Sequence, residues 1–306
     1  MEDVRGRAYA VREIALARTR TGAAYLRLVL WDGANRVEAR VWEAAVAEQL
    51  AGQVKPGDVL MVGEGRWTEY SGEKQLNVAV IRLAKPEEYD PSALRPKKEG
   101  VPTAEDLVRA MGSVQRAHLR ELLERVVDAA TLQEFAGAPA AKGYHHSYEG
   151  GLAEHTLEVV GFCEAAAKLY PALDRDLLVT AAILHDVGKL WEYDADSITF
   201  ERTDPGKLLG HIVLGWELTR RARHEIPRFP EGEGLHLEHL ILSHHGQKDW
   251  GSPVEPHTPE AVVLHQADLA SARVNQALQA VASAVPESWS QKDPSGRCFW
   301  AAVRKS

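Results

Sequence analysis

The sequence has few cysteines and no long apolar run. Cys163 and Cys298 are its only cysteines, and neither belongs to a CxxC pair, so a thiolate zinc site is not expected. Two scattered cysteines favour buried thiols in a reducing compartment over a disulfide. No run of roughly eighteen apolar residues occurs, and the charged start lacks the apolar segment of a signal peptide. We therefore expect a cytoplasmic protein with no membrane partner.

Histidine is absent from more than the first third of the chain. All 13 histidines lie at or after His118. Residues 1–95 carry 14 basic and 14 acidic residues, whereas the remainder carries 22 and 30, which accounts for the net charge of -8. This charge argues against a protein that coats nucleic acid by charge alone. The uneven distribution predicts two modules with different chemistry.

Residues 1–84 show the pattern of β-strands. Apolar and polar residues alternate over 24–30 and 36–42, and Asp32-Gly33 between them is a hairpin turn signal. Further elements are expected as strands at 4–11, 59–67 and 75–82 and as a short helix at 43–50. Five strands with a helix between the third and the fourth are the order of an OB-fold β-barrel, which commonly binds single-stranded nucleic acid. We therefore expect an OB-fold nucleic-acid-binding domain over residues 1–84.

Aromatic and basic residues are frequent in this first module. The aromatic residues are Tyr25, Trp31, Trp42, Trp67 and Tyr70, and the basic ones include Arg18, Arg20, Arg27, Arg40, Arg66 and Lys74. Aromatic rings can stack on bases while cations follow the phosphate backbone of a single strand. Packing in the barrel core is an equally good explanation for each tryptophan.

A proline-rich segment separates this module from a helical one. Residues 85–102 contain four prolines and many charges, which disfavour both a helix and an inner strand and predict a linker. Residues 103–306 then have apolar residues at helical spacing, with helix caps at Thr103, at Asp174 and at Thr258 before Pro259. The expected fold class is an N-terminal five-stranded OB-fold barrel followed by an all-α domain.

Two of these helices carry buried polar residues that need partners. His155 lies on the apolar side of its helix, where both ring nitrogens must be satisfied. Asp268 lies inside the long last helix among apolar neighbours, where an unpaired carboxylate is costly. A cation is therefore a reasonable partner for both side chains.

Other histidines stand at helix ends. His185-Asp186 ends an apolar helical segment, and Gly188 follows it as a helix stop. By itself this pair is better explained as a helix cap. His211 starts another helix and His244-His245 ends a further one, so that the candidate metal ligands come from five helices.

The order of these residues resembles the HD superfamily of metal-dependent phosphohydrolases. His155, His185-Asp186 and Asp268 match its signature, and Gly210-His211 and His244-His245 resemble its two-metal branch. The resemblance implies one ion held by His155, His185, Asp186 and Asp268. It implies a second ion held by His211, His244 and His245, with Asp186 as a bridge. Imidazole and carboxylate ligands favour two Mn²⁺ ions, with Fe²⁺, Co²⁺, Zn²⁺ or Ni²⁺ as alternatives.

Longer motifs are similar to those of the YhaM-type 3′–5′ exoribonucleases. These motifs are residues 144–156, 185–189, 210–215, 243–246, 251–253 and 258–261. That family joins an N-terminal OB-fold to a C-terminal HD domain, so the resemblance spans nearly the whole chain. It implies an exonuclease that hydrolyses single-stranded RNA, with single-stranded DNA as a second candidate substrate, after the OB domain has captured the strand.

Several residues around the motifs are candidates for contacts with substrate. Asp186 and Lys189 are the expected catalytic residues, and Lys189 could also bind a phosphate as a point charge, although a solvated helix-end lysine explains it nearly as well. His145, His146 and Arg273 are further substrate-binding candidates, with ordinary loop or surface roles as the alternative. His265 lies three residues before Asp268 and could be its hydrogen-bond partner.

Two other functions remain open from the sequence. The HD site could act on free or cyclic nucleotides, with the OB domain used for assembly. The chain could also be a non-enzymatic single-strand binder with a structural metal, although the intact set of candidate ligands argues against this. The sequence leaves open whether the chain forms a homo-oligomer.

Overall fold

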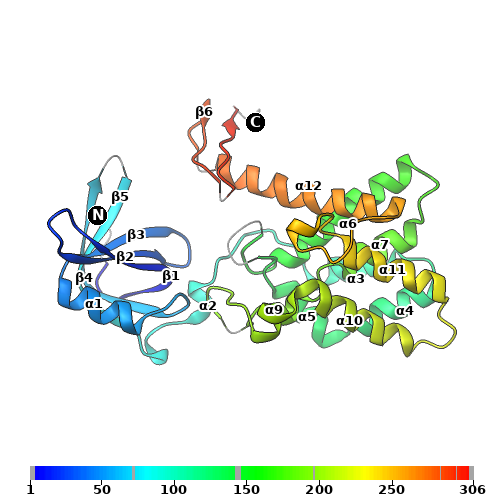
Figure 1. The fold of residues 1–306 in the computed structure, drawn as a ribbon, viewed down its shortest axis with the longest axis horizontal. Coiled ribbons are helices and arrows are strands. Elements are labelled where there is room, and N and C mark those ends of the chain that lie inside the picture. Colours follow the sequence, from blue (N-terminus) through cyan, green and yellow to red (C-terminus); the bar gives the residue numbers. More distant parts are fainter. Residues whose placement is uncertain are drawn as a thin grey trace. The chain divides into compact units, whose positions relative to one another are not determined.

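The computed structural model describes residues 4–70, 73–141, 146–195, 197–282, 284–293 and 295–302 (Figure 1). The chain forms two compact units. One consists of Met1–Lys97 with Asp196–Glu201, and the other of Lys98–Ala195 with Arg202–Ser306. Within the described residues, no helix combines the length and the apolar character needed to cross a membrane.

The first unit is a closed barrel. Its elements are β1 (Arg7–Arg18), β2 (Ala24–Trp31), β3 (Arg36–Val41), α1 (Ala44–Gln53), β4 (Val59–Tyr70) and β5 (Glu73–Leu83). The strands are ordered β1-β2-β3-β5-β4, with β3 and β5 parallel and the other pairs antiparallel. Helix α1 connects β3 to β4 and buries Ala47 and Leu50. This is the OB-fold order, and it confirms the expected fold class.

The barrel core follows from the alternation along the strands. On β2, Leu26, Leu28 and Leu30 are each 0% exposed, whereas Arg27 between them is exposed. Strand β1 is longer than the sequence pattern predicted because it pairs with two neighbours. Its first part pairs with β4 and its later part with β2, with a register shift between Val11 and Glu13.

The proline-rich segment after β5 is not entirely irregular. It contains the short helices η1 (Pro86–Glu88) and α2 (Pro91–Leu94), each of which begins with a proline. Leu94 is buried in a small apolar cluster with Ala10, Val59 and Ile198. The prolines therefore exclude a long helix but permit single turns, and the chain packs with the barrel as far as Lys97.

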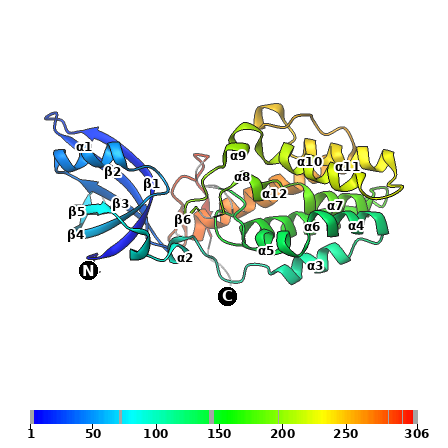
Figure 2. The same cartoon turned by 90° about the horizontal axis from the view of Figure 1, so that it is seen from below.

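The second unit is helical. Its helices are α3 (Ala104–Gly112), α4 (Ala117–Val126), α5 (Ala129–Gly137), α6 (Gly151–Leu169), α7 (Arg175–Leu184), α8 (Lys189–Glu192), α9 (Asp204–Leu208), α10 (Gly210–His224), α11 (Glu231–Ser243), η2 (Lys248–Trp250) and α12 (Pro259–Ala282). Every residue of α7 from Asp176 to Leu184 is buried. Helix α7 contacts α3, α4, α6, α11 and α12, as Figure 2 shows for the helices around it. It is therefore the central helix of the unit.

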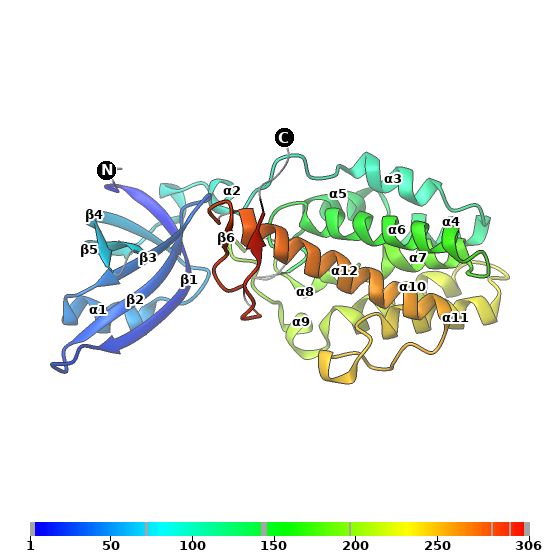
Figure 3. The same cartoon turned by 90° about the horizontal axis from the view of Figure 1, so that it is seen from above.

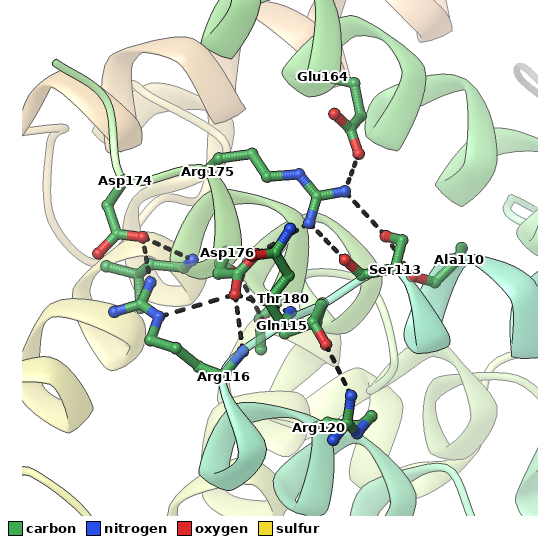
Figure 4. A network of polar contacts seen from close by, with 12 residues as sticks. Ala110, Ser113, Gln115, Arg116, Arg120, Glu164, Asp174, Arg175, Asp176 and Thr180 are labelled. Atoms are coloured by element: carbon green, nitrogen blue, oxygen red, sulfur yellow. Dashed lines mark hydrogen bonds and ion pairs between the residues drawn. The ribbon is translucent and has the colours of Figure 1, made fainter. Parts of the chain in front are cut away.

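A polar network fixes the start of α7 (Figure 4). The Asp176 carboxylate accepts hydrogen bonds from the backbone N–H groups of Gln115 and Arg116, each at 2.8 Å, and so joins α7 to the start of α4. Arg175 pairs with Asp176 and with Glu164 of α6. These bonds hold the first turn of the helix whose other end carries His185.

A small hairpin follows α12. Strands β6 (Ser288–Trp289) and β7 (Trp300–Ala301) pair antiparallel in the region that the sequence pattern predicted to be helical throughout. The prediction of an all-helical C-terminal segment is wrong here. Two-residue strands are too short to show the alternation by which a strand is recognised.

Replacement of a barrel leucine tests the inward register of β2. We expect Leu28→Ala to lower the free energy of unfolding by about 2–5 kcal/mol, because it removes a fully buried side chain and leaves a cavity. Leu16→Ala on β1, where the side chain is 47% exposed, should cost less than about 1 kcal/mol. Urea unfolding of both variants measures the difference. Equal losses would contradict the register.

Candidate metal centre

Seven candidate ligands come from the ends and inner faces of five helices. His155 lies on α6, His185 and Asp186 follow α7, His211 is on the first turn of α10, His244 and His245 follow α11, and Asp268 is on α12. Helix ends place side chains beyond the apolar packing of the helix bodies. The structure brings these seven residues together.

The first group surrounds one oxygen of Asp186. Ligand atoms of His155, His185 and Asp186 all lie within 4.8 Å of one another, and all three residues are buried. Asp186 Oδ2 is 3.3 Å from Nε2 of His155 and 3.3 Å from Nε2 of His185. Asp268 Oδ1 is 3.2 Å from His155 Nε2, so it borders the same group.

The second group faces the other oxygen of Asp186. Ligand atoms of His211, His244 and His245 also lie within 4.8 Å of one another. Asp186 Oδ1 is 3.4 Å from His211 Nε2 and 3.7 Å from His244 Nε2. One carboxylate therefore presents one oxygen to each group of histidines.

All five histidine rings are oriented in the same sense. Their Nδ1 atoms lie 2.7–2.9 Å from oxygen atoms, namely those of Ser271 (for His155), Ala182 (for His185), Glu192 (for His211), Ile241 (for His244) and Trp250 (for His245). Carbonyl and carboxylate oxygens only accept, and the Ser271 hydroxyl donates to Glu158, so each Nδ1 is the donor. When the ring is neutral, Nε2 is left as an acceptor, which is the tautomer that binds a metal ion.

Unsatisfied atoms test whether these residues fit a metal. Within the described part of the chain, Asp186 Oδ1, His211 Nε2 and His244 Nε2 are buried and have no hydrogen-bond partner. Leaving such atoms unpaired is costly, and all three face one another. A divalent cation bound by imidazole nitrogens and a carboxylate oxygen would satisfy them together. The arrangement fits a metal ion.

The protonation states of Asp186, Asp268 and His244 also suit metal binding. Burial would raise the pKa of Asp186, but Lys189 and His185 hold it well below its usual value, and His155 does the same for Asp268. Burial lowers the pKa of His244, and His245 lowers it further. Both carboxylates are thus ionised and His244 is neutral. His155 differs from these groups: burial would lower its pKa, but hydrogen bonds with Asp186 and Asp268 raise it to about 9. A metal ion that binds at His155 Nε2 would therefore displace a proton.

A pocket of about 570 Å³ opens beside both groups. His211, His245, Asp268 and Lys189 line it, together with Arg273. This volume lies in the range of pockets that enclose a small ligand. Buried Lys189 lines the pocket and is also 2.5 Å from Asp186 Oδ2. The Asp186 carboxylate keeps Lys189 charged, because it raises a pKa that burial alone would lower.

Comparison with known proteins adds a second line of evidence. Residues 152–273 match the model of the HD domain family. A protein named 3′–5′ exoribonuclease YhaM from Oceanobacillus iheyensis is 31% identical over 288 residues, which cover 92% of this chain and 88% of the relative. The protein of that name from Bacillus subtilis is 33% identical, covering 89% and 85%, and the one from Listeria welshimeri is 31% identical, covering 89% and 86%.

The chain belongs to the YhaM 3′–5′ exoribonuclease family. This confirms the resemblance inferred from the sequence motifs. The HD domain implies dependence on divalent metal, in agreement with the two groups of histidines.

The other residues singled out from the sequence take different positions in this YhaM family member. His145 lies outside the described residues. His146 is 0% exposed, with Nε2 3.2 Å from Glu158 and its ring 5.4 Å from that of His155. This position suits a residue that supports His155 better than one that touches substrate. His265 contacts the carbonyl oxygen of His244 at 2.9 Å, and no bond to Asp268 is found among the described residues.

Supporting residues of the site were missed in the sequence. Glu192 is 2% exposed and accepts the hydrogen bond of His211 Nδ1 at 2.9 Å. Behind His155, the Ser271 hydroxyl accepts a hydrogen bond from His155 Nδ1 and donates one to Glu158. Glu192 resembles an ordinary helix-surface glutamate, and the only available signal is that it follows Lys189 by three residues within one turn. Such residues fix the orientation of a ligand ring without touching the ion.

A close backbone contact holds His211 beside Asp186, and it can be tested. A Cβ at Gly188 would lie 2.0 Å from the backbone oxygen of His211. We expect Gly188→Ala to force α10 away, to lower the free energy of unfolding by about 1–3 kcal/mol and to reduce metal content. Gly161→Ala on α6, where a Cβ would meet nothing within 4 Å, should not destabilise the protein. Thermal unfolding measures the stability of both variants, and elemental analysis measures their metal content. Wild-type stability and metal content in Gly188→Ala would contradict the close contact.

Proposed function

We propose that this chain is a two-metal 3′–5′ exoribonuclease that releases nucleotides from the end of a single strand. The observation that carries the proposal is the position of Asp186 between the two groups. Its Oδ2 faces His155 and His185, and its Oδ1 faces His211 and His244. The exoribonuclease name of relatives that match nearly the whole chain supports RNA as the substrate.

The proposed ligand sets follow the two groups. His155, His185, Asp186 and Asp268 would hold one ion, and His211, His244 and His245 would hold the other, with Asp186 offering one oxygen to each group. Bound divalent ions would neutralise phosphate oxygens, lower the pKa of water and stabilise the attacking and leaving oxygens. Mn²⁺ suits this mixture of nitrogen and oxygen ligands, and Fe²⁺, Co²⁺, Zn²⁺ and Ni²⁺ are the alternatives.

The chain's own residues position the substrate. Lys189 places a positive charge at the pocket wall beside Asp186, where it can meet an oxygen of the phosphate that is cut. The histidine rings are held by acceptors at every Nδ1, so they need little reorganisation during the reaction. A pocket of this size accommodates the end of a strand better than a long internal stretch.

An exposed face of the barrel is suited to capture the strand. The rings of Tyr25 and Trp42 stack with centroids 4.8 Å apart, and the Arg40 guanidinium lies over both. Trp42 is 49% exposed and donates a hydrogen bond to Asn77 Oδ1. A partly exposed aromatic pair with an arginine and amide groups is typical of surfaces that stack bases of RNA or DNA single strands. We propose that this face binds the substrate away from the scissile bond.

Replacement of the bridging carboxylate tests the ligand assignment. We expect Asp186→Ala to lose both ions and all hydrolysis, because it removes the one carboxylate that faces both groups of histidines. His211→Ala should retain the first ion and lose the second. His224→Ala, at the exposed end of the same helix α10, is the matched control and should retain both. Elemental analysis that found two ions per chain in Asp186→Ala would refute the bridge.

Replacement of the exposed tryptophan tests strand capture. We expect Trp42→Ala to raise the KM for a long single-stranded RNA about tenfold and to leave kcat unchanged, because stacking contributes equally to ground state and transition state. Turnover of a small phosphodiester should not change. Leu16→Ala is the control on the barrel surface. An unchanged KM for RNA, combined with hydrolysis of free or cyclic nucleotides, would favour the alternative phosphohydrolase function.

A further inference from the structure

The pocket beside the metal centre has a second, basic wall. The later part of α12 and the segment between β6 and β7 contribute Arg273, Gln276, Ser295 and Arg297 to its lining. Figure 3 shows this hairpin at the C-terminal end of α12. The residues after Arg273 lie beyond the stretch that matches the HD domain model. Gln276, Ser295 and Arg297 therefore add to the matched stretch, which itself contributes Arg273 to this wall.

Arg297 is held in a fixed orientation on this wall. Its Nη2 donates to Asp293 Oδ2 at 3.0 Å and to Gln276 Oε1 at 3.1 Å, and its Nε donates to Ser295 Oγ at 2.7 Å. Asp293 also accepts hydrogen bonds from the backbone N–H groups of Ser295 and Arg297. Within the described ranges, the Nη1 group of Arg297 makes no hydrogen bond. A guanidinium held in place with donors to spare is prepared for a ligand.

The charge of the pocket also indicates an anionic ligand. Arg273 is exposed and makes neither a hydrogen bond nor an ion pair with any described residue. The acidic residues of the lining are already engaged, Glu192 by His211 and Asp268 by His155. Residues 96–306 have a net charge of -8, yet Arg273 has no acidic partner among the described residues. Arg297 pairs with Asp293, but its Nη1 group remains available to a ligand. An anion is the partner that this wall lacks.

We propose that Arg297 and Arg273 bind a second backbone phosphate of the strand, on the 5′ side of the bond that is cut. This inference rests on the proposed function, because it takes the substrate to be a chain with more than one phosphate. Guanidinium groups match phosphate oxygens in a forked geometry. The two arginines are specificity-determining residues: they favour a strand over a free nucleotide or a small diester, which has no second phosphate to offer.

A double-mutant cycle between protein and substrate tests the contact. The substrates are a trinucleotide of RNA and the same trinucleotide whose upstream linkage is an uncharged methylphosphonate. The proteins are the wild type, Arg297→Gln, Arg273→Gln and the control Arg221→Gln, which removes one exposed charge from α10. Each full-length protein is assayed for kcat and KM with Mn²⁺. Equilibrium binding of both trinucleotides to the metal-stripped proteins is measured by calorimetry.

For the wild type, we expect neutralisation of the upstream phosphate to raise both KM and Kd about tenfold. Relative to the wild type, Arg297→Gln should raise KM and Kd about tenfold for the native trinucleotide but less than twofold for the methylphosphonate. Arg221→Gln should match the wild type on both substrates. A role confined to holding the hairpin would give losses that simply add. Arg273→Gln removes no bond to any residue that the structure describes, so it reports on the wall even if Arg297→Gln misfolds.

The outcomes separate this inference from the proposed function. RNA hydrolysis without coupling in either assay would overturn the phosphate contact and leave the exoribonuclease function standing. Coupling in the binding assay without any RNA hydrolysis by the wild type would support the contact and overturn the function.

Discussion

The arrangement of the helical unit depends on one buried carboxylate shared between two groups of histidines. Asp186 is 1% exposed, and its two oxygens face different groups. Such a position is costly without positive charge nearby. Helix α7, which is buried from Asp176 to Leu184, ends just before Asp186, and its first turn is fixed to α4 and α6 by Asp176 and Arg175. The buried carboxylate of Asp186 therefore directly follows the central helix of the unit.

Orientation of the rings is the second constraint. Each histidine of the centre meets a protein oxygen at Nδ1, so the direction of Nε2 is set before any ion or substrate arrives. Glu192 and Ser271 supply two of these oxygens from side chains, and backbone carbonyls supply the others. The helix ends and these hydrogen bonds therefore orient the histidine rings without requiring a metal ion to do so.

The two units separate different physical tasks. Residues 1–95 have no net charge, and the barrel carries a stacked, partly exposed aromatic pair with an arginine over it, which suits weak, sequence-tolerant contacts with a strand. The helical unit is acidic overall but directs Lys189, Arg273 and Arg297 into one pocket. A local basic wall within an acidic domain concentrates attraction at the reaction site instead of over the whole surface.

The sequence by itself determined much of this protein. Strand alternation, the turn at Asp32-Gly33 and the cap at Asp174 predicted the barrel and the helices, because each depends on neighbouring residues alone. The order of histidines and aspartates identified the family and the candidate ligands. Tertiary structure alone decided that each oxygen of Asp186 faces a different group, that Glu192 orients His211, and that Arg297 reaches the pocket. These depend on contacts between residues distant in sequence, and two-residue strands such as β6 and β7 carry no periodic signal.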